Sequence, residues 1–147
     1  MKKSEIRKKI LKLRKESHSK DLQINFKSIV KILKKKGYKK KIIGGYYSYN
    51  YEASVMSTLA KFEKLRYMIS LPKIGKNYSM DFFVWSSKDP LIINKYGIPE
   101  PITNSIIYPD ILLVPLIAYD KDYNRIGYGG GYYDRYIQKI KKLKKII

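Results

Sequence analysis

Residues Gly127 to Arg135 place four glycines and an aspartate within nine positions. Glycine adopts positive φ without steric cost and leaves no side chain between the backbone and a ligand. The stretch directly precedes a helical pattern, so free backbone N–H groups and the positive end of a helix dipole would converge there. Such a turn suits a phosphate group, and Asp134 offers the oxygen ligand that a phosphate-bound Mg²⁺ prefers. For a short glycine pattern alone, a plain turn between a strand and a helix is about as common as a phosphate site.

The residues around these glycines make the pattern more specific. Residues Asn124 to Arg135 closely resemble the nucleotide loop of the 5-formyltetrahydrofolate cyclo-ligase family. Further stretches resemble segments of that family in the same order, so that the resemblance runs from about Lys2 to Leu143. These stretches are the basic pair Lys3 and Arg7, the segment Gly45 to Ser54, and the middle segments Asp89 to Leu91 and Tyr96 to Pro101.

The resemblance implies an enzyme, a ligase that closes 5-formyltetrahydrofolate to 5,10-methenyltetrahydrofolate with ATP and Mg²⁺, releasing ADP and phosphate. The formyl oxygen would attack the γ-phosphate, and N10 would then attack the activated formyl carbon. No side-chain nucleophile is needed, which suits a chain without cysteine whose single histidine, His18, we assign no role. The tasks left to the protein are positioning and charge stabilisation.

The resemblance also implies roles for particular residues. Arg125 would stabilise charge in the transition state, and Asp134 would hold the metal. The reduced folate would contact Tyr47, Glu52 and Tyr96. The residues implied for ATP are Lys3, Arg7, Arg125, Ile126, Gly127, Tyr128, Gly129, Gly130, Gly131, Tyr132 and Tyr133.

Without the resemblance, several of these residues have simpler interpretations. Lys3 and Arg7 are four residues apart on one helical face and would form an ordinary solvated basic surface. Glu52 would be an acid favoured at the amino end of a helix. The tyrosines would pack in the core or on the surface.

Composition narrows the class of protein. A chain of 147 residues is expected to form one domain, 1–147, with a real core. The absence of cysteine excludes disulfides, zinc–thiolate sites and thiol catalysis, and it fits a cytoplasmic protein. No apolar run is long enough to span a membrane, so we expect no membrane partner.

The formal charge of +20 has two interpretations. It could reflect a nucleic-acid or other polyanionic partner. The charge is mostly lysine and spread along the chain, however, and isoleucine, asparagine and tyrosine are also abundant, so we favour drift in an AT-rich genome and expect no specific nucleic acid. The alternative to the enzyme is a catalytically degenerate relative that binds nucleotide, or RNA through its basic surface.

Apolar periodicity predicts the elements that must position these residues. Alternating helices and strands with short connections predict a single α/β domain with three layers, Rossmann-like, in which helices flank a mainly parallel sheet. The glycine loop and the stretch from Tyr47 to Glu52 both follow strands, so we expect them at one edge of the sheet. We expect helices over 4–16, 20–36, from 52 onward and over 132–142, strands over 41–49, 66–71, 80–85 and 110–118, and a loop over 89–101.

The carboxyl end carries one more expectation. Family chains continue with a further strand and helix, and Lys144 to Ile147 resemble the start of that strand, so we expect a truncated carboxyl end. A sheet without this strand would leave unpaired backbone groups at its edge. We therefore expect possible self-association of the chain.

We predict that binding to nucleic acid is weak and not sequence-specific. Because the charge is diffuse, counterion release would dominate, and affinity would fall steeply between about 50 and 200 mM salt. Fluorescence anisotropy with labelled strands of several sequences measures this dependence. Tight, sequence-selective binding at physiological salt would contradict the prediction.

Overall fold

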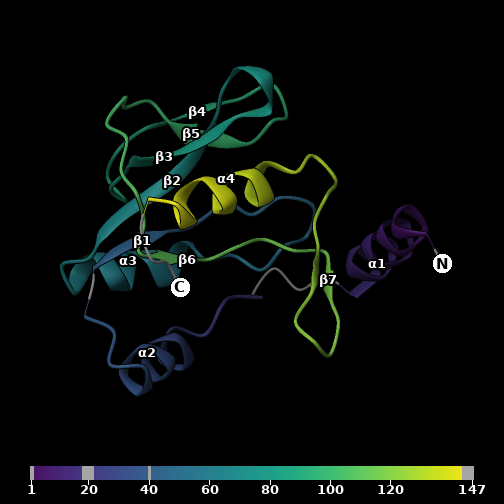
Figure 1. Cartoon of the computed structure of the whole chain (residues 1–147), viewed down its shortest axis with the longest axis horizontal. Helices are drawn as coiled ribbons and strands as arrows, with labels where there is room; N and C mark the ends of the chain where they lie inside the picture. The colour runs from purple at the N-terminus through teal and green to yellow at the C-terminus, as the bar shows by residue number, and fades with distance from the viewer. Residues whose placement is uncertain (1, 18–21, 40, 144–147) are drawn as a thin grey trace.

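The structure, a computed structural model, describes residues 2–17, 22–39 and 41–143. Its centre is a four-stranded sheet in the order β3-β2-β1-β6 (Figure 1). Strand β1 pairs in parallel with β2 and β6, whereas β3 joins the edge antiparallel to β2. The expected α/β class is confirmed, with a mixed sheet. The strands are β1 (Ile42–Gly44), β2 (Met68–Ile74), β3 (Met80–Val84) and β6 (Ile111–Leu112).

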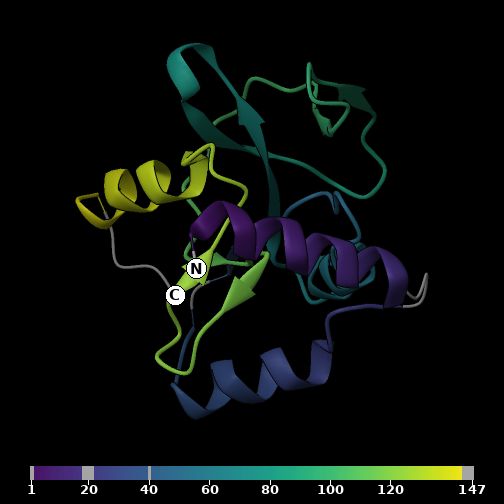
Figure 2. The same cartoon turned by 90° about the vertical axis from the view of Figure 1, so that its right-hand side faces the viewer.

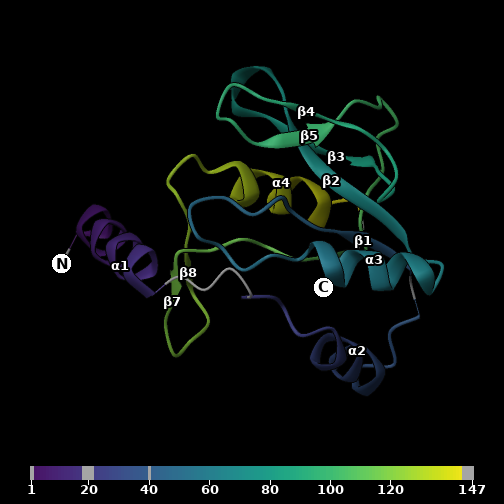
Figure 3. The same ribbon diagram turned by 180° about the vertical axis from the view of Figure 1, so that it is seen from behind.

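Helices cover both faces of this sheet. Figure 1 shows α4 over one face, and Figure 3, from behind, shows α3 over the other. Leu59 and Phe62 of α3 pack with Ile43 of β1 in a core cluster that also takes Leu33 of α2. A second core cluster joins Tyr136 and Ile140 of α4 to Met80 and Phe82 of β3 on the other face. The three helices are α2 (Phe26–Lys35), α3 (Met56–Lys64) and α4 (Tyr132–Lys141).

Helix α1 (Lys3–Ser17) lies beside the sheet layers rather than on them (Figures 1 and 2). The helix expected over 4–16 is thus confirmed, but it has no fully buried residue. Two arginines attach it to the chain ahead of the glycine loop and to the loop itself. Arg7 Nε donates to the Gly127 carbonyl oxygen at 2.8 Å, and Arg14 donates to the carbonyl oxygens of Leu116 and Ile117 at 2.6 and 2.8 Å.

Two helices begin later than their apolar pattern predicted. The helix expected over 20–36 begins only at Phe26, so the prediction is wrong for 22–25. Asn25 caps α2 by accepting a hydrogen bond from the Ser28 N–H at 3.2 Å. Lys20 lies outside the described residues. The helix expected from Glu52 begins at Met56. Positive φ at Asn50 and Tyr51 places Glu52 in a tight turn instead.

The strand predictions were too long in two places and missed two hairpins. Main-sheet pairing covers three residues of the segment 41–49 and two of 110–118, where β6 ends before Pro115. The two short hairpins are β7 (Ala118–Tyr119) with β8 (Arg125–Ile126), and β4 (Leu91–Ile93) with β5 (Pro99–Pro101), the latter within the expected loop 89–101.

Strand β2 continues through Pro72 to Ile74, past residue 71, where the predicted strand ended. Pairing with β1 stops at Ser70, whereas pairing with β3 continues to Ile74. Pro72 therefore lies where β2 has one neighbour, and the ladder tolerates a residue without an N–H there. The extended part of β2 and the start of β3, which a 3₁₀ turn at Lys76–Tyr78 connects, reach the candidate site.

The carboxyl-terminal expectation lies outside the described residues, because 144–147 are not among them. The truncation and the self-association therefore stay predictions. Within residues 2–17, 22–39 and 41–143, no helix has the length and apolarity needed to cross a bilayer.

Tyr136 of α4 allows a test of the core between α4 and the sheet. Its ring packs 4.9 Å from the Phe82 ring, and its buried hydroxyl finds no hydrogen-bond partner among the described residues. We expect Tyr136→Phe to keep the free energy of unfolding or raise it by about 1 kcal/mol, because it removes an unpaired buried hydroxyl. Tyr136→Ala should lower it by about 3–5 kcal/mol. Urea unfolding measures both, and a clear loss in Tyr136→Phe would contradict the argument.

Candidate functional site

A cavity of about 320 Å³ lies beyond the carboxyl end of β1. Its wall combines α1, the segment after β1, the β4–β5 hairpin and the glycine loop, which lie far apart in the sequence. Each residue that the sequence assigned to ATP, folate or metal lines this cavity, with the exception of Gly130. The two loops thus meet at one cavity as expected, although the glycine loop follows β8 of a separate hairpin and not a strand of the main sheet.

The glycine loop connects β8 to α4. Gly129 and Gly131 have φ values of 102° and 69°, which side-chain-bearing residues rarely adopt. Gly131 is the N-cap of α4 and supplies no side-chain hydrogen bond to it. The backbone N–H groups of the first turn are therefore left for another acceptor, and the helix dipole favours an anion there.

Three cationic side chains border the loop. Arg7 lies against it, because a Cβ atom built on Gly129 would be 3.4 Å from the Arg7 guanidinium carbon. Lys3, one helical turn earlier on α1, also lines the cavity, as does Arg125 from β8. The cavity thus combines a helix amino terminus with positive charge on two sides.

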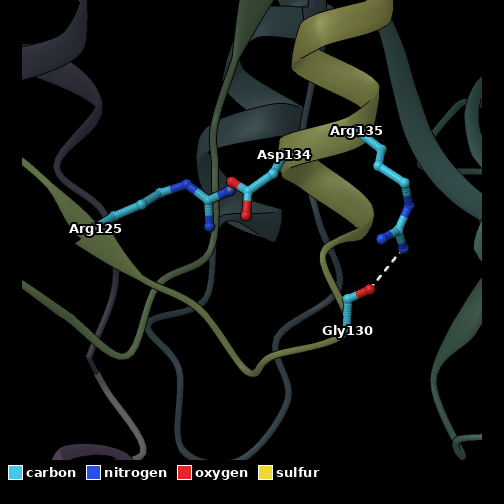
Figure 4. Close-up of polar contacts among 4 residues, drawn as sticks. All are labelled: Arg125, Gly130, Asp134 and Arg135. Atoms are coloured by element: carbon cyan, nitrogen blue, oxygen red, sulfur yellow. Dashed lines mark hydrogen bonds and ion pairs between the residues drawn. The ribbon is translucent and has the colours of Figure 1, made fainter. Parts of the chain in front are cut away.

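Asp134 in the first turn of α4 forms a close ion pair with Arg125 (Figure 4). The side chain of Asp134 is 76% exposed, and that of Arg125 is 22% exposed. Among the described residues, no three His, Cys, Asp or Glu side chains group as a metal site would need. A single carboxylate nevertheless fits Mg²⁺, which commonly takes one or two protein carboxylates together with substrate phosphates and water.

Glu52 is a buried carboxyl group in the same cavity, with 8% of the residue exposed. Its Oε2 atom accepts the Tyr49 N–H at 2.8 Å. Burial raises the pKa of Glu52 above its usual value, although hydrogen bonds from Tyr49 and Tyr128 and the charge of Arg14 act in the opposite direction. A carboxyl group perturbed in this way within a cavity is typical of functional sites.

Tyrosines form much of the remaining wall. The hydroxyls of Tyr96, in the β4–β5 hairpin, and Tyr132, in α4, are 3.1 Å apart. This contact, with burial, raises the pKa of Tyr132 to about 12. Tyr133 packs edge-on to the Phe82 ring, with centroids 6.4 Å apart, and burial raises its pKa strongly. Tyr47 lies between β1 and the turn that carries Glu52.

Known proteins resemble this chain in both sequence and fold. The sequence profile of the 5-formyltetrahydrofolate cyclo-ligase family matches residues 1–146. The chain belongs to this family. It is 36% identical over 106 residues to the 5-formyltetrahydrofolate cyclo-ligase of Haemophilus influenzae, covering 67% of this chain and 56% of that protein.

A second relative and two solved structures extend the comparison. The probable cyclo-ligase of Schizosaccharomyces pombe is 36% identical over 78 residues, which cover 48% of this chain and 38% of that one. The chain thus spans about half the length, or less, of these curated relatives. The NMR structure of 5,10-methenyltetrahydrofolate synthetase from Aquifex aeolicus superposes with a TM-score of 0.76 at 27% identity, covering 96% of this chain and 74% of that chain. The synthetase from Mycoplasma pneumoniae gives 0.69 at 25% identity, with 98% and 82% covered.

The structure adds residues that the sequence did not single out for this family member. Asn94 lines the cavity and accepts the backbone N–H groups of Tyr96 and Ile98, which holds the Tyr96 turn in place. An Asn three residues before Gly97 is a recognisable turn signal that could have indicated this role. Further residues line the cavity because β2, β3 and the β4–β5 hairpin pass beside it. They are Pro72, Ile74, Met80, Ile98 and Pro99.

Arg135 is a further residue whose role the sequence did not specify. Its guanidinium group lies over the rings of Tyr78 and Tyr132, at 5.9 and 5.5 Å from their centroids. It donates to the Gly130 carbonyl oxygen at 2.6 Å (Figure 4) and to that of Tyr78 at 3.0 Å. Arg135 therefore braces the glycine loop against the 3₁₀ turn after β2.

Burial of Glu52 predicts a specific dependence of stability on pH. Because its folded pKa is raised above the ordinary value of 4.5, the folded state binds more protons than the unfolded state just above that pH. Its contribution to the free energy of unfolding is therefore full below about pH 4.5, decreases as pH rises through the folded pKa, and is constant above it. Glu52→Gln should remove this decrease.

Urea unfolding from about pH 4 to pH 8 tests this prediction. The matched control is Glu16→Gln, because Glu16 lies on the exposed side of α1 and its substitution should keep the wild-type profile. An unchanged profile in Glu52→Gln would show that the carboxyl is not the titrating group.

Proposed function

We propose that this chain catalyses the ATP- and Mg²⁺-dependent cyclisation of 5-formyltetrahydrofolate to 5,10-methenyltetrahydrofolate, with release of ADP and phosphate. The observation that carries the proposal is that one cavity joins a glycine loop at a helix amino terminus to a buried carboxyl group. An anion site and a hydrogen-bonding site for a polar ring are what the two substrates require. The family and the names of its relatives support the same reaction.

The glycine loop is the proposed site of the nucleotide phosphates. Backbone N–H groups between Gly127 and Tyr133 would contact phosphate oxygens, as at other helix amino termini. Lys3 and Arg7 would neutralise phosphate charge from the side of α1. Arg125 would stabilise the charge that develops as the phosphoryl group moves.

Asp134 is the proposed ligand of Mg²⁺. The bound ion would neutralise charge on the phosphates that are transferred and released. Arg125 would then exchange its Asp134 partner for a phosphate oxygen, because both are anionic. The ion pair would thus keep both side chains near the loop before the nucleotide binds.

Glu52 is the proposed anchor of the pterin ring. Its carboxyl oxygens would accept hydrogen bonds from N–H groups of the ring, and the low exposure of Glu52 would strengthen these hydrogen bonds. Tyr47 and Tyr96 would provide flat faces beside the ring. The formyl oxygen would then face the γ-phosphate at the junction with the glycine loop.

In the proposed reaction, the formyl oxygen forms a bond to the γ-phosphorus while the bond between that phosphorus and ADP breaks. N10 next bonds to the activated formyl carbon and loses its proton, and the carbon–oxygen bond breaks to release phosphate. The protein supplies no nucleophile, so its contribution is to align the two substrates and exclude water. The cavity between α1, the hairpin and α4 would serve both purposes.

We also propose that residues 1–147 form one cyclo-ligase-like domain that works in the cytoplasm, where folate and ATP are available. Self-association of the chain stays a proposal.

The proposal predicts turnover that requires both ATP and Mg²⁺. Purified protein is mixed with 5-formyltetrahydrofolate, and formation of methenyltetrahydrofolate is followed by its absorbance. Omission of either ATP or Mg²⁺ should abolish the signal. Folded protein that binds ATP without forming this product would instead support the non-catalytic nucleotide-binding relative.

Asp134→Asn should weaken Mg²⁺-dependent ATP binding by about tenfold or more while the fold stays intact, because the metal loses its protein carboxylate. Without Mg²⁺, the variant should bind ATP at least as well as the wild type, since Arg125 has lost its anionic partner. Isothermal titration calorimetry with and without Mg²⁺ separates the two effects. Asp122→Asn, on the exposed β7–β8 hairpin, is the matched control, and an unchanged Mg²⁺ dependence in Asp134→Asn would refute the assignment.

A further inference from the structure

The side chain of Tyr128 leaves the glycine loop and reaches the turn that carries Glu52. Its hydroxyl donates a long hydrogen bond of 3.3 Å to the carbonyl oxygen of Tyr49, 79 residues away in the sequence. Burial, together with the charge of the nearby Glu52 carboxyl group, raises the pKa of the same hydroxyl. The rings of Tyr49 and Tyr128 lie 6.1 Å apart at an angle of 58°. Tyr128 thus connects two segments of the cavity wall.

The turn at the far end of this connection has an unusual backbone. Asn50 and Tyr51 both have positive φ, at 47° and 62°, a conformation that is costly for residues with a Cβ atom. The turn is closed by the Glu52 N–H on the Tyr49 carbonyl oxygen at 3.1 Å and by the Tyr49 N–H on Glu52 Oε2 at 2.8 Å. Tyr128 binds the same carbonyl oxygen that closes the turn, so it stabilises the conformation that positions Glu52.

The near end of the connection lies in a backbone that a ligand would order. Gly127, before Tyr128, is held through its carbonyl oxygen by Arg7, and Gly129, after it, has a φ of 102°. Arg7 and Arg135 hold the loop through its carbonyl oxygens, so a ligand on its N–H groups would add a restraint that these side chains do not supply. A phosphate bound there would restrict the backbone of Tyr128 and thereby the direction of its side chain.

We infer that Tyr128 is a positioning residue that couples the glycine loop to the Glu52 turn, so that a nucleotide on the loop increases the affinity of the turn for the folate. The inference rests on the proposed function, which places these two ligands. Nucleotide binding orders Tyr128, Tyr128 orders the turn, and the second ligand then binds a turn that is already formed. Linkage requires that folate binding strengthens nucleotide binding by the same factor.

The coupling is measured by calorimetry with 5-formyltetrahydrofolate, in the presence and absence of Mg²⁺ and a non-hydrolysable ATP analogue. In the wild-type protein, the analogue should tighten folate binding about fivefold or more. In Tyr128→Phe, which keeps the ring and removes the hydroxyl contact to Tyr49, this factor should fall toward one. The control is Tyr123→Phe on the β7–β8 hairpin, where 85% of the residue is exposed, and it should keep the wild-type factor.

Hydrogen exchange with the analogue alone gives a second measurement that needs neither turnover nor folate. Amides of residues 49–52 should become more protected when the analogue binds the wild-type protein, and less so in Tyr128→Phe. Thermal unfolding of both proteins in the absence of ligand establishes that the variant is folded.

The outcomes separate this inference from the proposed function. Equal coupling factors in wild type and Tyr128→Phe, or a wild-type factor of one, would overturn the inference while leaving the enzyme assignment in place. Protein that binds the analogue but not the folate would contradict the proposed function. In that case the exchange of residues 49–52 still decides whether Tyr128 transmits nucleotide binding to the turn.

Discussion

The glycine loop depends on contacts from outside itself, and the surrounding structure supplies them. Four glycines give it the backbone freedom and close approach that an anion requires, but they leave little side-chain packing to hold its shape. Its carbonyl oxygens are held instead by Arg7 from α1 and Arg135 from α4. A third contact, from Tyr128, runs outward to the turn at Tyr49. Because Arg7 and Arg135 bind carbonyl oxygens of the loop, its N–H groups stay available to bind an anion.

The cavity separates two electrostatic environments within a short distance. Cationic groups surround the loop, and the ion pair of Arg125 with Asp134 lies partly in solvent, where it contributes little to stability. Glu52 lies at the other part of the wall in a desolvated setting that raises its pKa. The proposed sites for the phosphates and for the polar ring therefore lie in different surroundings within one cavity. The overall charge of +20 matters less to the site than this local arrangement.

The sequence predicted the α/β class well because the class depends on local periodicity. The stripes of α1 and α4 and the apolar strands β2 and β3 follow from side-chain spacing, which tertiary contacts did not change. The apolar run over 110–118 was misleading, because apolar residues can be buried beside the sheet as well as in it. The β4–β5 hairpin escaped prediction because prolines obscure its edge strands.

The sequence by itself determined the chemical types at the site: a glycine loop, Asp134 after it, basic residues on one face of a helix, and a family resemblance that joined them. Only the tertiary structure decided that Glu52 lies in a turn, that Asp134 pairs with Arg125, and that Tyr128 reaches Tyr49. The physical reason is the range of the interactions. Glycine conformation and helical spacing act over a few residues, whereas burial of a carboxyl group and contacts between distant loops exist only after the chain has closed around its sheet.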